Sequence, residues 1–104
     1  MTEKLGELAR ERIKRDGNPL WKDKALDIID LATVHNLETE AFIGDEFEIL
    51  ICIYKGNEFV DIEFENSGTI DYIHTKDNEE IERHENIEYQ NVIIKLQKYV
   101  EDIK

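Results

Sequence analysis

The chain has almost none of the residues that would cross-link it or carry it through a membrane. Its 104 residues include one cysteine and one proline. Because Cys52 is alone, an internal disulfide is excluded. No apolar run approaches the ~18 residues of a membrane-spanning helix, and the charged N-terminus lacks the apolar stretch of a signal peptide. We therefore expect a cytoplasmic protein.

Motifs for catalysis, metals and cofactors are also missing. The sequence has no P-loop and no GxGxxG, GxSxG or CxxC pattern. His35, His74 and His84 have no metal-ligand spacing with one another or with Cys52. The acidic stretch 77–80 could bind Ca²⁺ weakly, but the spacing and the glycine of an EF-hand are absent. We therefore expect a non-enzymatic protein with no catalytic residue, no metal and no cofactor.

Negative charge is what the sequence has in excess. Twenty-five Asp and Glu residues against 13 Lys and Arg give a formal net charge of −12. Residues 1–24 hold seven basic and five acidic residues, whereas residues 25–104 hold six and twenty. Nucleic acid and anionic membranes both require a basic surface, so direct binding to either is not expected. An acidic surface favours a basic protein as the partner.

Apolar periodicity divides the chain into helices and strands. Residues 2–16 repeat at helical spacing, with Thr2 as N-cap and Gly17 as the stop. A second helix follows Asn18 and Pro19, and the strongest helical pattern begins at residue 87 and continues to the C-terminus. Alternation with a period of two predicts four strands, at 41–43, 46–54, 58–64 and 69–74. The polar stretch 75–86 is expected to form a loop, with at most one helical turn.

These elements predict one α+β domain over residues 1–104. It consists of two N-terminal helices, a four-stranded antiparallel meander, and a C-terminal helix packed on one sheet face. Helices on one face leave the other face of an antiparallel sheet open to solvent or to a partner.

Strand parity predicts which side chains the uncovered face carries. If Phe47, Ile49, Val60 and Ile70 point toward the helices, the residues of opposite parity point outward. Acidic residues are unfavourable on strands, so a binding role is one reason for their presence there. The other reading is that an acidic surface only keeps the protein in solution. The candidate partner-binding residues are Glu46, Glu48, Tyr54, Phe59, Asp61, Glu63 and Asp71.

Two resemblances follow from these features. The stretch KGNEFVDIEFENSGTIDY and the acidic tract 77–85 resemble small phage inhibitors of CRISPR effectors. This likeness is one of charge, size and layout over about a third of the chain. It implies that carboxylates mimic a nucleic-acid phosphate backbone. The helix PLWKDKALDII and the DIEF strand are similar to small bacterial antitoxin or immunity-type proteins. No motif aligns position by position, so no site residue is carried over from either group.

Two functions follow as hypotheses. In the first, the chain neutralises a basic, nucleic-acid-binding partner, as an anti-CRISPR, antitoxin or immunity protein would. In the second, it is a structural or accessory subunit of a larger assembly. Salt dependence separates the two, because charge mimicry weakens steeply with ionic strength and apolar docking does not. The sequence is compatible with a monomer or a homodimer.

Overall fold

The computed structural model describes residues 6–101, which form three helices and five strands. Within these residues the chain begins with α1 (Glu7–Asp16) and α2 (Lys22–Val34) and ends with α3 (Tyr89–Glu101). The strands between them are β1 (Glu38–Ile43), β2 (Ile49–Lys55), β3 (Glu58–Phe64), β4 (Ile70–Lys76) and β5 (Glu79–His84). None of the helices in the described part of the chain is long and apolar enough to cross a membrane.

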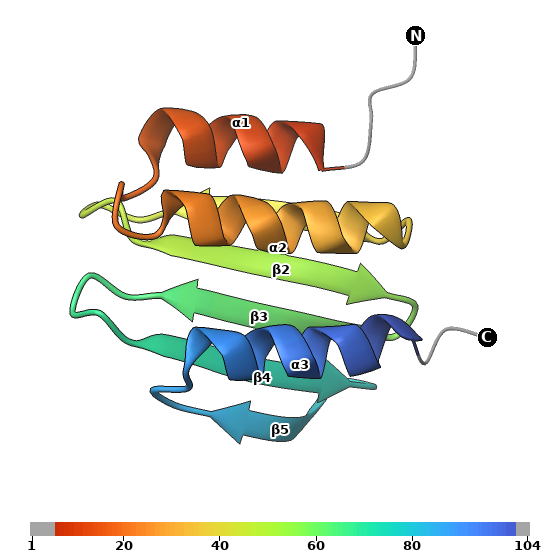
Figure 1. Ribbon diagram of the computed structural model, residues 1–104. Helices are drawn as coiled ribbons and strands as arrows, with labels where there is room; N and C mark the ends of the chain where they lie inside the picture. The colour runs from red at the N-terminus through yellow and green to blue at the C-terminus, as the bar shows by residue number, and fades with distance from the viewer. Residues whose placement is uncertain (1–5, 102–104) are drawn as a thin grey trace, which may run out of the picture.

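The sheet is an antiparallel meander in which each strand pairs with its neighbour in sequence, in the order β1-β2-β3-β4-β5. All three helices lie on the same side of this sheet (Figure 1). The predicted α+β class with one helix-covered face is therefore confirmed. The predicted number of strands is wrong, because the described residues form five strands and not four.

The core lies between the helices and the sheet face that they cover. Ile51, Ile62 and Phe64 are fully buried on this face. Trp21 packs on Phe64 with a ring-centroid distance of 5.2 Å, and its indole N–H donates to the Glu65 carbonyl oxygen at 2.7 Å. This tryptophan thus ties the start of α2 to the end of β3, as expected for an amphipathic aromatic side chain.

The expected loop at 75–86 is instead the second half of a β-hairpin. Strand β4 continues to Lys76, and β5 returns from Glu79 to His84. Asp77 and Asn78 connect the strands with φ angles of 52° and 67°. Two successive residues with positive φ match the twist of antiparallel strands, and Asp and Asn tolerate this conformation better than most residues. Because this segment is polar, it lacks the apolar alternation on which the strand predictions depend, and the strand was not predicted.

The predicted start of the second strand, at residue 46, is also wrong. Strand β2 begins at Ile49, and the preceding residues form a turn closed by hydrogen bonds between Gly44 and Glu48 and between Phe47 and Gly44. Phe47 has a φ of 70° and is 59% exposed, so it does not face the helices. Its carbonyl oxygen accepts the Asn18 N–H at 2.9 Å, which links this turn to the segment between the first two helices. The strand therefore begins three residues later than the pattern predicted, because a turn includes residues 46–48.

The helix boundaries follow the expected residues with some shifts. Thr2 lies outside the described residues, and α1 begins at Glu7 after Gly6. Helix α1 ends before Gly17, where a Cβ atom would lie 2.8 Å from Ile49 Cδ1. The Ile13 carbonyl oxygen would lie even closer, at 2.7 Å, so crowding by α1 and β2, and not a left-handed cap, accounts for this glycine. Helix α2 begins at Lys22, later than predicted.

Candidate protein-binding face

The sheet face that the helices leave uncovered, here called the open face, carries three cross-strand rows of side chains. Period-two alternation and the strand register bring together residues that are far apart in the sequence. From β1 toward β5 these rows are Phe42, Leu50, Glu63 and Asp71; then Glu40, Cys52, Asp61, Ile73 and Arg83; then Glu38, Tyr54, Phe59 and Thr75.

Three carboxylates gather at one end of the open face. Glu63 and Asp71 are directly opposite each other on β3 and β4, and Glu65 follows β3 by one residue. One oxygen atom from each of these three side chains lies within 4.8 Å of the others. We call these three residues the acidic cluster. Its oxygens are spaced so that they could surround one positive charge, whether a hard metal ion or a basic side chain.

Crowding within the acidic cluster raises the pKa of Glu63 to about 7. The largest cause is a hydrogen bond between the Glu63 and Glu65 side chains, followed by partial burial. The negative charges of Glu65, Asp71 and Glu48 add to the shift. Like charges that share a site disfavour the ionised form of one of them. At pH 7 the Glu63 carboxyl is therefore protonated in about half of the free molecules, and an approaching cation would favour its ionised form.

The middle row places a thiol beside a carboxylate. Cys52 Sγ donates to Asp61 Oδ1 at 2.9 Å. Burial, together with the hydrogen bond and charge of Asp61, raises the pKa of the Cys52 thiol to about 12. A thiol that stays protonated at neutral pH is a poor nucleophile and a poor metal ligand. The raised pKa disfavours Cys52 as a nucleophile, and the hydrogen bond leaves Asp61 with a second oxygen for a partner.

An aromatic pair lies at the opposite end of the open face. Tyr54 and Phe59 face each other across β2 and β3, with ring centroids 6.2 Å apart. The Tyr54 hydroxyl donates to Glu40 Oε1 at 2.6 Å, which holds the ring in place. The pair lies four residues along β2 from Leu50, the neighbour of Glu63, so about 13 Å separates it from the acidic cluster. The open face thus has an acidic end and an aromatic end.

The structure places five of the seven predicted site residues on the open face: Tyr54, Phe59, Asp61, Glu63 and Asp71. Glu46 lies in the turn before β2 and is not part of this face. Glu48 also precedes β2, although its charge acts on Glu63. The site prediction missed Glu65, which continues the parity of Asp61 and Glu63. Glu65 lies between the predicted strands 58–64 and 69–74, and extending the alternation by one residue would have included it.

Comparison of the chain with protein-family models, curated proteins and solved structures finds no match.

Proposed function

We propose that this protein is a non-enzymatic acidic binder of the cytoplasm that neutralises a basic, nucleic-acid-binding protein through its open face. The observation that carries this proposal is the acidic cluster on a sheet face that no helix covers. The Glu63 carboxyl supports this proposal, because its pKa is raised to about 7 by a hydrogen bond with Glu65, by partial burial and by repulsion from neighbouring carboxylates. A basic partner would relieve that repulsion.

In the proposed mechanism, the acidic cluster takes the place of a phosphate backbone and pairs with Lys or Arg side chains of the partner. Glu63, Glu65 and Asp71 accept hydrogen bonds from one such side chain, and Glu63 releases its proton. Charge-assisted hydrogen bonds of this kind are stronger than neutral ones. Tyr54 and Phe59 supply apolar contact area, since aromatic residues are enriched at interface centres. The net charge of −12 speeds the encounter with a basic surface.

The accessory-subunit function is the second candidate, and exposed apolar side chains favour it. Phe42 is 46% exposed at the β1 end of the open face, and Phe47 and Leu20 are 59% and 61% exposed. Scattered exposed apolar residues are normal on protein surfaces. Phe42 alone among these three belongs to the rows that contain the acidic cluster, so it could serve either function.

The experiment compares three proteins as baits in an extract of the source organism, at 50 and at 300 mM NaCl. They are the wild type, the triple variant Asp61→Asn/Glu63→Gln/Asp71→Asn, and a control that loses the same charge elsewhere, Glu79→Gln/Glu85→Gln/Glu88→Gln. The captured protein is then tested for nucleic-acid binding with and without each bait.

We expect the wild type and the control to capture a basic protein at low salt and to block its nucleic-acid binding. The open-face variant should bind more weakly, by about 1–3 kcal/mol for each desolvated charged pair that is lost. Equal capture by both triple variants, with the same dependence on salt, would remove the basis for charge mimicry and leave the accessory-subunit function.

A further inference from the structure

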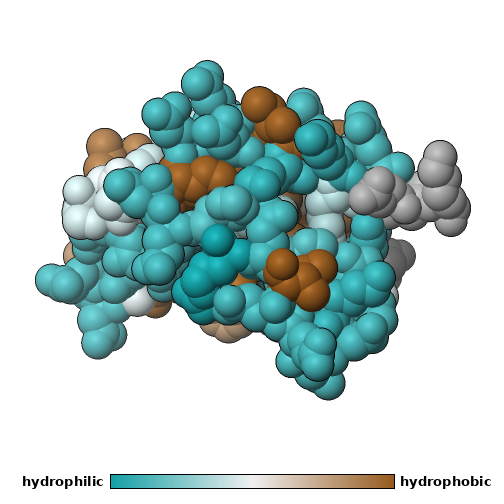
Figure 2. Space-filling view, turned by 90° about the horizontal axis from the view of Figure 1, so that it is seen from below, coloured by the Kyte–Doolittle hydropathy of each residue, from teal (hydrophilic) through white to brown (hydrophobic). Residues whose placement is uncertain are grey.

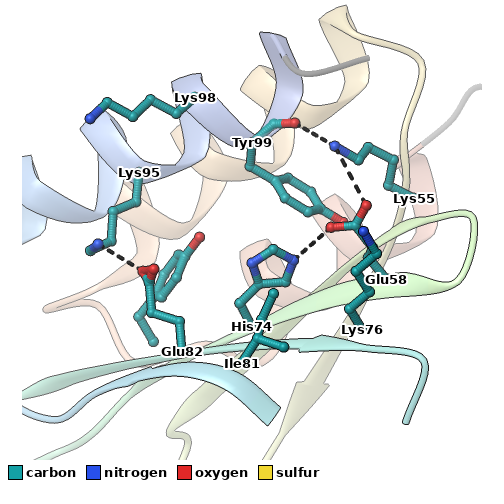
Figure 3. Close-up of a pocket in the computed structure, with 10 residues that line it drawn as sticks. Lys55, Glu58, His74, Lys76, Ile81, Glu82, Lys95, Lys98 and Tyr99 are labelled. Carbon is teal, nitrogen blue, oxygen red and sulfur yellow. Dashed lines mark hydrogen bonds and ion pairs between the residues drawn. The ribbon is translucent and has the colours of Figure 1, made fainter. Parts of the chain in front are cut away.

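A second site lies on the opposite side of the sheet from the open face. A cavity of about 590 Å³ lies between α3 and the helix-facing ends of β2, β3, β4 and β5. Figure 3 shows Lys95 and Lys98 projecting from α3, whereas Glu58, His74 and Lys76 come from the sheet. We call this space the lysine pocket. Its volume lies within the range of roughly 300–1,000 Å³ that is typical of sites for small ligands.

The charge of the lysine pocket is opposite to that of its surroundings. Residues 25–104 contain only six Lys and Arg against twenty Asp and Glu. Four of those six, Lys55, Lys76, Lys95 and Lys98, line this one cavity. Two glutamates also line it, so the pocket has a formal excess of two positive charges when His74 is neutral. Clefts lined by charge of one sign concentrate ions of the opposite sign.

Both glutamates of the pocket already have partners. Glu58 accepts a hydrogen bond from His74 at 2.8 Å and lies 4.0 Å from Lys55 Nζ. Glu82 pairs with Lys95 at 2.7 Å, and this contact lowers the pKa of the Glu82 carboxyl. Within residues 6–101, Lys76 and Lys98 form no ion pair. Their ammonium groups are therefore available to a ligand.

A buried hydroxyl group gives independent support for a ligand. Tyr99 lines the pocket and is only 5% exposed, yet its hydroxyl has no hydrogen-bond partner among the described residues. The ring is held on two sides, by Lys55 Nζ at 4.3 Å from its centroid and by an edge-on contact with His74 at 5.1 Å. Buried polar groups in folded proteins are normally paired, and each exception requires an explanation. An acceptor atom of a bound ligand would satisfy this hydroxyl.

We propose that the lysine pocket binds a small organic phosphate. Ammonium groups bind phosphate as point charges, and a phosphate monoester carries close to two negative charges at neutral pH, which matches the pocket's excess of two positive charges. Lys76 and Lys98 provide the positive charge, and the Tyr99 hydroxyl donates to a phosphate oxygen. The cavity is much larger than a bare phosphate, and Ile81, which is 55% exposed, offers apolar surface to the organic part. This site is separate from the open face and does not depend on the function proposed for it.

The probes are AMP, glucose 6-phosphate, phenyl phosphate and inorganic phosphate, each titrated at constant ionic strength into the full chain. Adenosine and malonate serve as a neutral and a carboxylate control. Binding is followed by melting temperature and by the backbone amide NMR signals of Lys76, Lys98 and Tyr99. We expect at least one organic phosphate to shift these signals and raise the melting temperature more than inorganic phosphate does.

Three variants locate the site. Lys76→Gln/Lys98→Gln should weaken the best probe by about tenfold or more, because hydrogen bonds to charged groups contribute strongly to binding. Tyr99→Phe should weaken it severalfold while leaving the free protein at least as stable, since the lost hydroxyl has no partner. The matched control Lys14→Gln/Lys24→Gln loses the same charge on α1 and α2 and should bind normally.

Three outcomes would overturn the proposal. The first is that none of the phosphates binds. The second is that malonate or adenosine binds as well as the phosphates do. The third is that the control variant and the pocket variant lose affinity equally.

Discussion

At the scale of single residues, the fold holds the carboxylates of the acidic cluster close together on the open face, where they repel one another. Glu63 is flanked by Glu65 and Asp71, and no basic residue among those described is paired with any of them. On the other side of the sheet, Lys76 and Lys98 line the lysine pocket and form no ion pair with another described residue. Pairing these lysines with the acidic cluster would have been favourable, but the sheet separates them. Each side of the sheet thus keeps charged groups that form no ion pair with another described residue.

Glu63 makes the stability of the protein depend on pH. Its pKa in the folded state is about 7, against a reference value of 4.5. Between these values the folded protein binds more protons than the unfolded chain, so the free energy of unfolding falls as the pH rises from 4.5 to 7. We expect Glu63→Gln to stabilise the protein at pH 8, by on the order of 1 kcal/mol after solvent screening, and to have little effect at pH 4.

Urea denaturation of the wild type and of Glu63→Gln at both pH values measures this effect. Glu79→Gln, an exposed carboxylate on β5, is the control and should show no such difference between the two pH values. A stabilisation by Glu63→Gln that is equal at pH 4 and pH 8 would contradict the raised pKa.

At the scale of secondary-structure elements, prediction succeeded where apolar residues alternate without a break. Strand β3 has the predicted bounds because Val60, Ile62 and Phe64 alternate with polar residues between two clear turns. Strand β5 was missed because its helix-facing residues, Glu82 and His84, are polar and contact the lysine pocket or its rim and not the apolar core. The lysine pocket was not predicted for the same reason, because polar residues on a strand are normally expected on the solvent-exposed side. Only the tertiary position of α3 shows that these polar residues face inward.

The turn between β4 and β5 gives the second prediction. Asn78 has a φ of 67°, a conformation that is strongly unfavourable for a β-branched residue. We expect Asn78→Val to lower the free energy of unfolding by about 1–2 kcal/mol. Asn78→Gly should be neutral or stabilising, because glycine suits this position of the turn. Equal stability of the two variants in chemical denaturation would show that residues 77–78 do not form this turn.

Helix α3 gives the third prediction. Leu96 is fully buried against the sheet, and we expect Leu96→Ala to cost about 2–5 kcal/mol through lost contacts and the cavity that remains. Ile94 lies on the same helix but is 50% exposed, so Ile94→Ala is the control and should cost much less. The measurement is urea unfolding followed by circular dichroism. A loss below about half a kcal/mol for Leu96→Ala would mean that α3 does not cover the sheet as described.

At the scale of the whole molecule, charge dominates the surface. Figure 2, which views the protein from the β5 side, shows a mostly hydrophilic surface with small, separate apolar areas. Strand β5 is an edge strand and carries Glu79, Glu80, Glu82 and Arg83. Charged side chains on an edge strand discourage pairing with another sheet. This edge is therefore a poor place for two copies of the chain to associate.

Self-repulsion from the net charge of −12 gives the fourth prediction. Salt screens interactions between exposed charges, so we expect the melting temperature at pH 7 to rise between 20 and 300 mM NaCl. Isolated surface ion pairs such as Arg10 with Asp30 weaken under the same conditions, but each contributes little. A melting temperature that falls with added NaCl would show that attractive pairs outweigh the repulsion.

The order of the strands has a consequence for how quickly the chain folds. Each strand is joined to its sheet neighbour by five residues or fewer, so no strand pairing has to close a long loop. The entropic cost of closing a loop grows with its length, and proteins rich in local contacts fold fastest. We expect the hairpins to form independently and to merge as successive strands pair. A domain of this topology should fold on the order of milliseconds. Fast folding shortens the time during which unpaired strand edges are exposed to other chains.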